Sequence, residues 1–329
     1  MGAIRDFMEL NYRHFNARET LAAAQAYEAH LQAGGKMLVS LAGAMSTGEL
    51  GIALSRMIRA GFVHAISCTG ANLEEDVFNL ISHDDYEIIP DWRALSAETE
   101  RDLYERGYNR VTDTSIPETA MRDLERLLIQ RWKKACEEGV PRTPAEHLWD
   151  VLRSGDLEAE YQIDPDCCWM IAAMEAGIPV FAPGWEDSTT GNMLAAAVMS
   201  GRVPHHGCVT TGTEQFERLM RWYLENDGRQ GGGPDNPSVG FFQIGGGIAG
   251  DFAICAVPCL IQDLKKEDTP FWGYFAQISE AMTSYGGYSG APPNEKITWG
   301  KLDVGTPKFV IESDATIVAP LIFSYLLGD

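Results

Sequence analysis

The residues best suited to catalysis lie in one stretch near the end of the sequence, from Thr283 to Lys301. Its first half is rich in Gly, Ser, Tyr and Pro, which predicts an irregular loop whose backbone can approach a ligand closely. In its second half, Trp299 stands two positions before Lys301, and Glu295 stands six positions before it. A lysine held against an aromatic wall loses its charge more readily than a lysine in water, and the neutral amine is a nucleophile. A surface turn with a solvated lysine fits the same residues.

Two further groups of residues suit ligand binding. Ala42-Gly43-Ala-Met-Ser46 follows an apolar run, and small residues between a strand end and a helix N-terminus suit a phosphate, although a simple turn explains them equally well. Glu74 and Glu75 are adjacent carboxylates at a predicted helix start. Such a pair either caps the helix or holds an ammonium group and a ribose hydroxyl.

A glycine pattern, Gly245-x-Gly247-x-x-Gly250, follows a predicted strand and fits the dinucleotide fingerprint. That fingerprint also requires an acidic residue at the end of a strand about 20 residues later. Asp263 is near that offset but lies in a charged, polar segment. We therefore interpret the glycines as a tight turn between a strand and a helix.

Alternating apolar runs and helical patterns must position these residues. Strands are predicted at 36–42, 62–67, 178–182, 239–244, 273–278 and 308–312, with helices at 50–60, from 72, at 187–199 and from 314. This order predicts an α/β fold, with a doubly wound, mostly parallel, Rossmann-like sheet. The segment at about 84–165 is rich in charge and poor in strand signals. Its helical patterns at 96–106 and 118–138 predict a helical insertion within a single domain, residues 1–329.

Three local expectations accompany this pattern. Ser46-Thr47 and Asn72 are expected to cap the helices that follow the first two strands. The Gly-rich residues 228–237 are expected to form a flexible loop.

The end of the stretch from Thr283 to Lys301 resembles the E-A-V-S-W-G-K motif of the deoxyhypusine synthase family; here it reads Glu295-Lys-Ile-Thr-Trp-Gly-Lys301. Thr69 to Asp76 is similar to that family's T-A-G-G-V-E-E-D, and further matches run from about Gly43 to Pro320. The resemblance thus covers nearly the whole chain. It implies an NAD-dependent transferase that moves an aminobutyl group from a polyamine such as spermidine through an enzyme–lysine imine, with Lys301 as the nucleophile.

The resemblance also implies which residues form the site. The NAD contacts would be Ala42, Gly43, Ser46, Thr69, Gly70, Glu75, Asp187, Asp314 and Ala315. The amine contacts would be Glu74, Glu75, Asn192, Gly246, Asp251, Tyr288, Ser289, Glu295 and Trp299. Lys301 and Asp251 would be catalytic. The family's assembly is a homotetramer of tight dimers, with NAD and amine at the dimer interface.

Three positions depart from the family pattern. Asn192 and Tyr288 stand where the family has aspartates, and Asp251 stands where it has its active-site histidine. These changes favour a small-molecule acceptor, such as a free diamine that gives homospermidine or a related polyamine, over a protein lysine that becomes deoxyhypusine. A simple NAD-dependent amine dehydrogenase is an alternative from another class. A non-catalytic binding protein is a third, which the retained Lys301 disfavours.

Composition limits the partners. The chain has 26 basic and 47 acidic residues, a net charge of −21, which argues against nucleic acid and anionic membranes and fits a cationic polyamine. Acidity for solubility alone explains the same charge. The seven cysteines lack a zinc-type spacing, so we expect no metal. Without a signal peptide or a long apolar run, the expected location is the cytoplasm.

Overall fold

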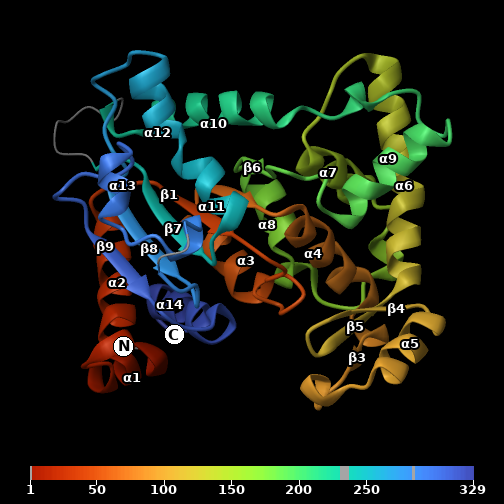
Figure 1. The fold of residues 1–329 in the computed structure, drawn as a ribbon, viewed down its shortest axis with the longest axis horizontal. Helices are drawn as coiled ribbons and strands as arrows, with labels where there is room; N and C mark the ends of the chain where they lie inside the picture. Colours follow the sequence, from red (N-terminus) through yellow and green to blue (C-terminus); the bar gives the residue numbers. More distant parts are fainter. Residues whose placement is uncertain (1, 230–236, 284–285) are drawn as a thin grey trace.

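In the computed structural model, which describes residues 2–229, 237–283 and 286–329, a six-stranded sheet forms the centre of the fold (Figure 1). The strands lie in the order β6-β2-β1-β7-β8-β9. Their bounds are β1 (Met37–Leu41), β2 (Ala65–Cys68), β6 (Val180–Phe181), β7 (Gly240–Ile244), β8 (Tyr274–Ile278) and β9 (Lys308–Ile311). All their pairings are parallel, so the predicted α/β fold with a mostly parallel sheet is confirmed.

The strand order reverses between β1 and β7, because the chain adds β2 and β6 on one side before it returns to add β7, β8 and β9 on the other. In open parallel sheets, ligands bind outside the carboxyl ends of the strands at such a switch point. A ligand-binding site is therefore expected at the carboxyl edge of the sheet near β1 and β7.

Helices cover both faces of the sheet (Figure 1). They are α1 (Ala3–Asn11), α2 (Phe15–Gln32), α3 (Gly51–Arg59), α4 (Gly70–Ser82), α5 (Ala97–Glu105), α6 (Glu118–Glu138), α7 (Pro144–Ser154), α8 (Trp169–Ala176), α9 (Thr189–Met199), α10 (Gly212–Asn226), α11 (Gly247–Ile254), α12 (Ala256–Pro258), α13 (Glu295–Thr298) and α14 (Ala315–Leu327). One core includes residues of α2, α3, α8 and α14, and a second core on the opposite face includes residues of α10, α11 and α12. The inner strands are buried along their whole length, which is why they read as continuous apolar runs.

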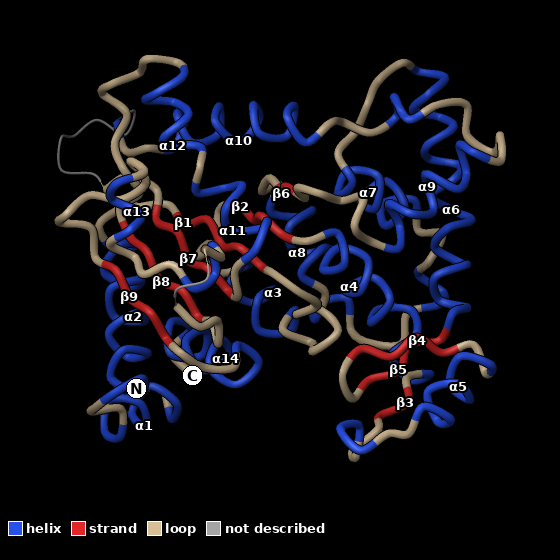
Figure 2. The backbone as a smooth tube through the Cα atoms, in the orientation of Figure 1, coloured by secondary structure: helices blue, strands red, loops and turns tan. Residues whose placement is uncertain are grey.

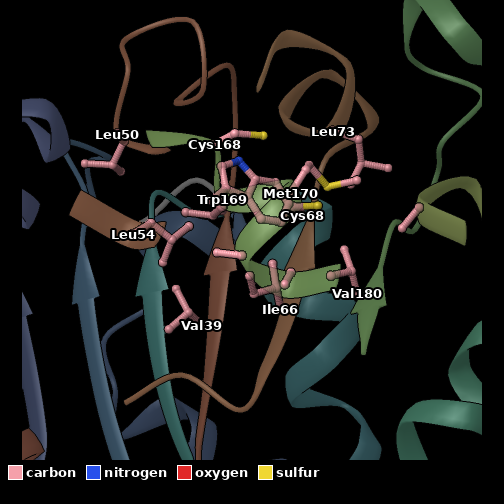
Figure 3. Close-up of a cluster of buried hydrophobic side chains, with 14 of the residues drawn as sticks. Val39, Leu50, Leu54, Ile66, Cys68, Leu73, Cys168, Trp169, Met170 and Val180 are labelled. Carbon is pink, nitrogen blue, oxygen red and sulfur yellow. The ribbon is translucent and has the colours of Figure 1, made fainter. Parts of the chain in front are cut away.

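The core above β1 and β2 is built around the start of α8 (Figure 3). Trp169 is fully buried there, and its indole N–H donates to Ser46 Oγ at 3.0 Å. The buried carboxylate of Asp76 accepts from the Met170 N–H at 2.9 Å and from Cys168 Sγ at 2.8 Å. These bonds satisfy polar groups inside an apolar cluster and fix α8 against α4.

A second, three-stranded antiparallel sheet lies away from the main one, beside α5 (Figure 2). It contains β3 (Glu87–Ile88), β5 (Thr114–Pro117) and β4 (Tyr108–Val111), in that order. The helices expected at 96–106 and 118–138 are present as α5 and α6, but the segment 84–165 is not helical throughout. Its strands are only two to four residues long, too short for a period-two pattern to stand out.

Two predicted caps are wrong. The helix after β1 begins at Gly51 without a side-chain cap, while Ser46 Oγ donates to the Asn72 carbonyl at 2.8 Å. The cap of α4 is Thr69, whose side chain accepts from the Asn72 N–H. Asn72 lies inside α4, and its side chain holds the turn after β1 by donating to the Gly43 carbonyl at 3.0 Å.

The loop expected at 228–237 lies mostly outside the described residues. None of the helices in the described ranges is long and apolar enough to span a membrane.

Candidate active site

The turn at the end of α13 places Lys301. Gly300 adopts a left-handed conformation at φ 67°, the Lys301 N–H donates to the Lys296 carbonyl at 3.0 Å, and the Gly300 N–H donates to the Ile297 carbonyl at 3.0 Å. This is the Schellman pattern of a helix C-terminus, which favours glycine at the left-handed position. The Trp-Gly-Lys sequence therefore has a structural reason: the glycine ends the helix and turns the lysine inward.

Lys301 is buried, with only 6% of its surface exposed. Its Nζ lies 2.9 Å from Asp251 Oδ1, on α11. The rings of Tyr288 and Trp299 flank it, with centroids 5.2 and 5.8 Å from Nζ. The predicted partners Asp251, Tyr288 and Trp299 are thus brought to the lysine, and the alternative of a solvated surface lysine is excluded.

A cavity of 480 Å³ opens beside Lys301. It is lined by Asp251, Cys255, Thr283, Gly286, Gly287, Tyr288, Ala291, Pro292, Glu295, Lys296, Trp299 and Lys301. Glu295 and Trp299 are exposed, so they lie where the cavity meets solvent. The cavity is large enough for a small amine with an aliphatic chain.

Two buried glutamines, which were not predicted from the sequence, hold one wall of this cavity. Gln243 on β7 and Gln277 on β8 are register partners. Tyr288 donates its hydroxyl proton to Gln243 Oε1 at 2.6 Å, and Gln277 Nε2 donates to the Ser289 carbonyl at 2.8 Å. The sequence feature that could have pointed to them is a single glutamine in each of two otherwise apolar strands, because a buried amide needs a polar partner.

The glycines after β7 serve close packing. A Cβ on Gly246 would come within 2.0 Å of Ser289 Oγ, and Ser289 Oγ accepts from the Gly247 N–H at 2.9 Å. The predicted contacts Gly246 and Ser289 therefore touch each other and support the loop that carries Tyr288. Whether they also touch an amine stays a prediction.

Two larger cavities lie at the carboxyl edge of the sheet. One, of 670 Å³, is lined by Ala44, Met45, Thr47, Gly48, Trp92, Arg93, Val111, Thr112, Asp113, Thr114, Gly245, Ile278, Ser279, Glu280, Ser313, Asp314, Ala315 and Thr316. The other, of 630 Å³, includes Glu74, Glu75, Val111, Asp187 and Asn192 in its lining. Val111, in the small antiparallel sheet, lines both, so the two cavities adjoin there. The segment 84–165, which the sequence predicts to be a helical insertion, therefore supplies a wall at this edge of the sheet.

Four of the residues expected to contact NAD line these two cavities: Glu75, Asp187, Asp314 and Ala315. The other predicted NAD contacts do not line either cavity. Ser46 is buried, and Thr69 donates its hydroxyl proton to the Gly43 carbonyl at 2.7 Å. Ala42, Gly43 and Gly70 belong to the same turns and do not line either cavity.

Polar atoms at this edge remain available for a ligand. Glu75 Oε2 and Thr47 Oγ1 are buried and form no hydrogen bond of normal geometry in the described residues. Burial raises the pKa of Glu75 to about 7, although the neighbouring hydroxyl and N–H of Thr47 partly oppose this rise. Unsatisfied buried oxygens are costly unless a ligand or water completes them. The residues present therefore fit a hydroxyl-rich cofactor such as NAD.

Glu74 and Asn192 have structural bonds of their own. The Glu74 carboxylate accepts from the Thr189 and Thr190 N–H groups at 2.8 and 2.7 Å, at the start of α9. Asn192 Nδ2 donates to the Ser188 carbonyl at 2.7 Å. Both residues hold α9 in place, and their predicted contact with an amine stays a prediction.

Among the described residues, no group of three or more His, Cys, Asp or Glu side chains is arranged to hold a metal ion.

Fold and site together define an α/β protein with ligand cavities at the carboxyl edge of a parallel sheet and a buried, carboxylate-paired lysine in a cavity of its own. The sequence model of deoxyhypusine synthase matches residues 7–326, and the chain belongs to that family.

Relatives agree with this assignment. A deoxyhypusine synthase-like protein of Thermosynechococcus vestitus is 29% identical over 88% of this chain and 69% of its own length. The "probable deoxyhypusine synthase 1" of Archaeoglobus fulgidus is 25% identical over 95% of this chain and 90% of its own. The crystal structure of a "putative deoxyhypusine synthase" from Entamoeba histolytica shares the fold, with a TM-score of 0.53 and 12% identity over 89% of this chain and 76% of that one.

Proposed function

We propose that this protein is an NAD-dependent aminoalkyl transferase, in which Lys301 carries the alkyl group of an amine donor as an imine. The observation that carries the proposal is the placement of Lys301, buried against Asp251 and two aromatic rings in a 480 Å³ cavity. Membership of the deoxyhypusine synthase family supports it, since aminobutyl transfer from a polyamine is that family's activity.

The chain's own residues have distinct tasks in this reaction. Asp251 holds Lys301 in place and can take or return the proton that its amine loses and regains. Lys301 attacks the imine carbon of the oxidised donor, and the donor's remaining amine leaves. Tyr288 and Trp299 flank the alkyl chain and limit access of water, which would otherwise hydrolyse the imine. Glu295, at the mouth of the cavity, can pair with an ammonium group.

NAD supplies the acceptor and donor of hydride when it is bound. Glu75, Asp187, Asp314 and Ala315 are the residues that would hold it, since they line the adjoining edge cavities. Asp314 already accepts from the Thr316 N–H at 2.8 Å, as the cap of α14, which fixes its carboxylate at the cavity wall. A crosslink that placed NAD on residues 245–250, away from all four, would remove this assignment.

The acceptor in this proposal is a small amine. Asn192, Asp251 and Tyr288 replace the residues that the resemblance expects, and Tyr288 fills part of the cavity wall with a ring. A simple amine dehydrogenase is the competing activity, because it needs the same cofactor edge but no lysine nucleophile.

The product spectrum separates these activities. The purified protein is incubated with NAD⁺, spermidine and putrescine, and the products are identified by mass spectrometry. Transfer gives a new polyamine without net accumulation of NADH, because the hydride is returned in the same turnover. Stoichiometric NADH with an aldehyde product would instead establish a dehydrogenase.

A further inference from the structure

Lys296 is a second buried lysine in the Lys301 cavity, with 2% of its surface exposed. The Schellman turn brings the two residues close along the chain, because Lys296 provides the carbonyl that accepts from the Lys301 N–H. Their Nζ atoms lie 4.9 and 5.2 Å from the centroid of the same Tyr288 ring. They can be no farther apart than the sum of those distances, a span that a short aliphatic chain bridges.

The two lysines differ in their charge partners. Lys301 pairs with Asp251, whereas no carboxylate in the described part of the chain lies within ion-pair distance of Lys296. Lys296 Nζ donates to the Ala291 carbonyl at 3.2 Å and lies 5.0 Å from the Phe275 ring centroid. Burial, together with the charge of Lys301, lowers the pKa of Lys296 to about 8. Buried lysines are rare unless paired.

The other titratable groups of the cavity do not neutralise Lys296. Asp251 pairs with Lys301. Both Glu295, at the exposed mouth of the cavity, and Asp251 raise the pKa of Lys296, but by less than burial and the charge of Lys301 lower it. Burial raises the pKa of Tyr288 and of the Cys255 thiol above their usual values, so both stay neutral near pH 7. The cavity thus contains one cation without a counter-ion of its own.

We propose that the acceptor amine carries a carboxylate, as an ω-amino carboxylate whose nitrogen faces Lys301 and whose carboxylate pairs with Lys296. The inference rests on the proposed function, because it names the acceptor class of the same cavity. A carboxylate there forms a charge-assisted hydrogen bond with Lys296, while the second ammonium of a diamine meets a like charge. In the transfer step, the acceptor amine adds to the imine carbon, the bond from that carbon to Lys301 breaks, and the two hydrogens of the acceptor amine end on the released Lys301 amine. The product is an imine of the acceptor, which the hydride taken from the donor reduces.

This pairing makes binding depend on pH in a definite direction. A bound carboxylate favours charged Lys296 and raises its pKa, so binding takes up a proton where free Lys296 is partly neutral. Affinity is highest below about pH 8 and falls as the pH rises through that value.

The test compares 5-aminopentanoate with 1,5-diaminopentane, which differ only in one end group, by calorimetry in buffers of different ionisation enthalpy. The wild-type protein binds 5-aminopentanoate with proton uptake near pH 8. Lys296→Met weakens that binding roughly 10- to 100-fold without weakening diamine binding. Lys296→Arg retains the charge and the binding to within a few-fold but loses the proton uptake. Lys308→Met, which removes an amine bonded only to backbone carbonyls outside the cavity, binds as wild type does.

Each outcome separates this inference from the proposed function. Failure of 5-aminopentanoate to bind, or equal binding by Lys296→Met, overturns the carboxylate assignment even if transfer to a diamine occurs. Binding that depends on Lys296 in a protein that forms no lysine adduct retains the carboxylate site and removes the transferase. Thermal unfolding checks that each variant is folded. If Lys296→Met does not fold, the loss of proton uptake in Lys296→Arg tests the carboxylate assignment instead.

Discussion

At the scale of single residues, Glu75 shows how burial converts a surface-type side chain into a functional group. The residue is 7% exposed, its Oε2 forms no hydrogen bond of normal geometry with the described residues, and burial raises the pKa of its carboxyl group to about 7. Such a group destabilises the free protein when charged, and a ligand that donated a hydrogen bond to it would offset this cost. Removing the charge of Glu75 should therefore stabilise the free protein and weaken cofactor binding.

Glu75→Gln should stabilise the free protein at pH 8 and weaken NAD binding. Because the folded pKa is raised above the unfolded value, the folded state loses stability as the pH rises from about 4.5 through 7. The amide escapes this loss, so we expect a gain of about 1–3 kcal/mol at pH 8 that vanishes near pH 4.5. Denaturant unfolding at both pH values, with exposed Glu267→Gln as the matched control, checks it. A variant less stable than wild type at pH 8 would refute the explanation.

At the scale of elements, the sequence predicts what is long and regular. The six strands were predicted to within a few residues because each is a mainly apolar run, fully buried in β1, β7 and β8, and α6 was predicted at its observed bounds. The antiparallel sheet at 84–165 was missed because its strands are very short, and the caps after β1 and β2 were misassigned because tertiary bonds of Ser46 and Asn72 replace local capping. Lys296 was overlooked as a site residue because only the folded turn buries it beside Lys301.

The turn after α13 gives a prediction at this scale. Gly300→Ala forces an alanine into the left-handed region at φ 67°, which costs about 1–2 kcal/mol. Its Cβ would meet nothing closer than 3.5 Å, so the cost comes from the backbone alone. We expect a matching loss in unfolding free energy and a larger loss in activity, because the turn aims Lys301. Gly300→Asn, which tolerates this region better, should recover part of both, and an alanine variant with full activity would contradict the role of the turn.

At the scale of the whole molecule, the lysine cavity and the edge cavities are separate within one chain. Among the described residues, the Lys301 cavity shares no lining residue with the edge cavities that contain Asp187, Asn192 and Asp314. This separation supports a symmetric oligomer, the homotetramer implied by the resemblance, in which one chain's lysine faces its partner's cofactor edge.

Complementation between variants tests the shared site. Lys301→Ala and Asp187→Ala should each be inactive, yet a mixture dissociated and reassembled should regain roughly a quarter of the wild-type rate, because half the dimers are mixed and each has one intact site. Light scattering should show an oligomer at micromolar concentration. An active monomer, or a reassembled mixture without activity, would rule out a site shared between chains.

Borohydride trapping would identify the lysine that forms the imine, which we propose is Lys301. Wild-type protein incubated with NAD⁺ and spermidine, then reduced, should carry an added alkyl mass on the peptide that contains Lys301. Lys301→Arg should carry none, because guanidinium stays charged and cannot form the adduct, and Lys308→Met should be labelled as wild type is. An adduct on Lys296 instead, or full transfer activity in Lys301→Ala, would contradict the account.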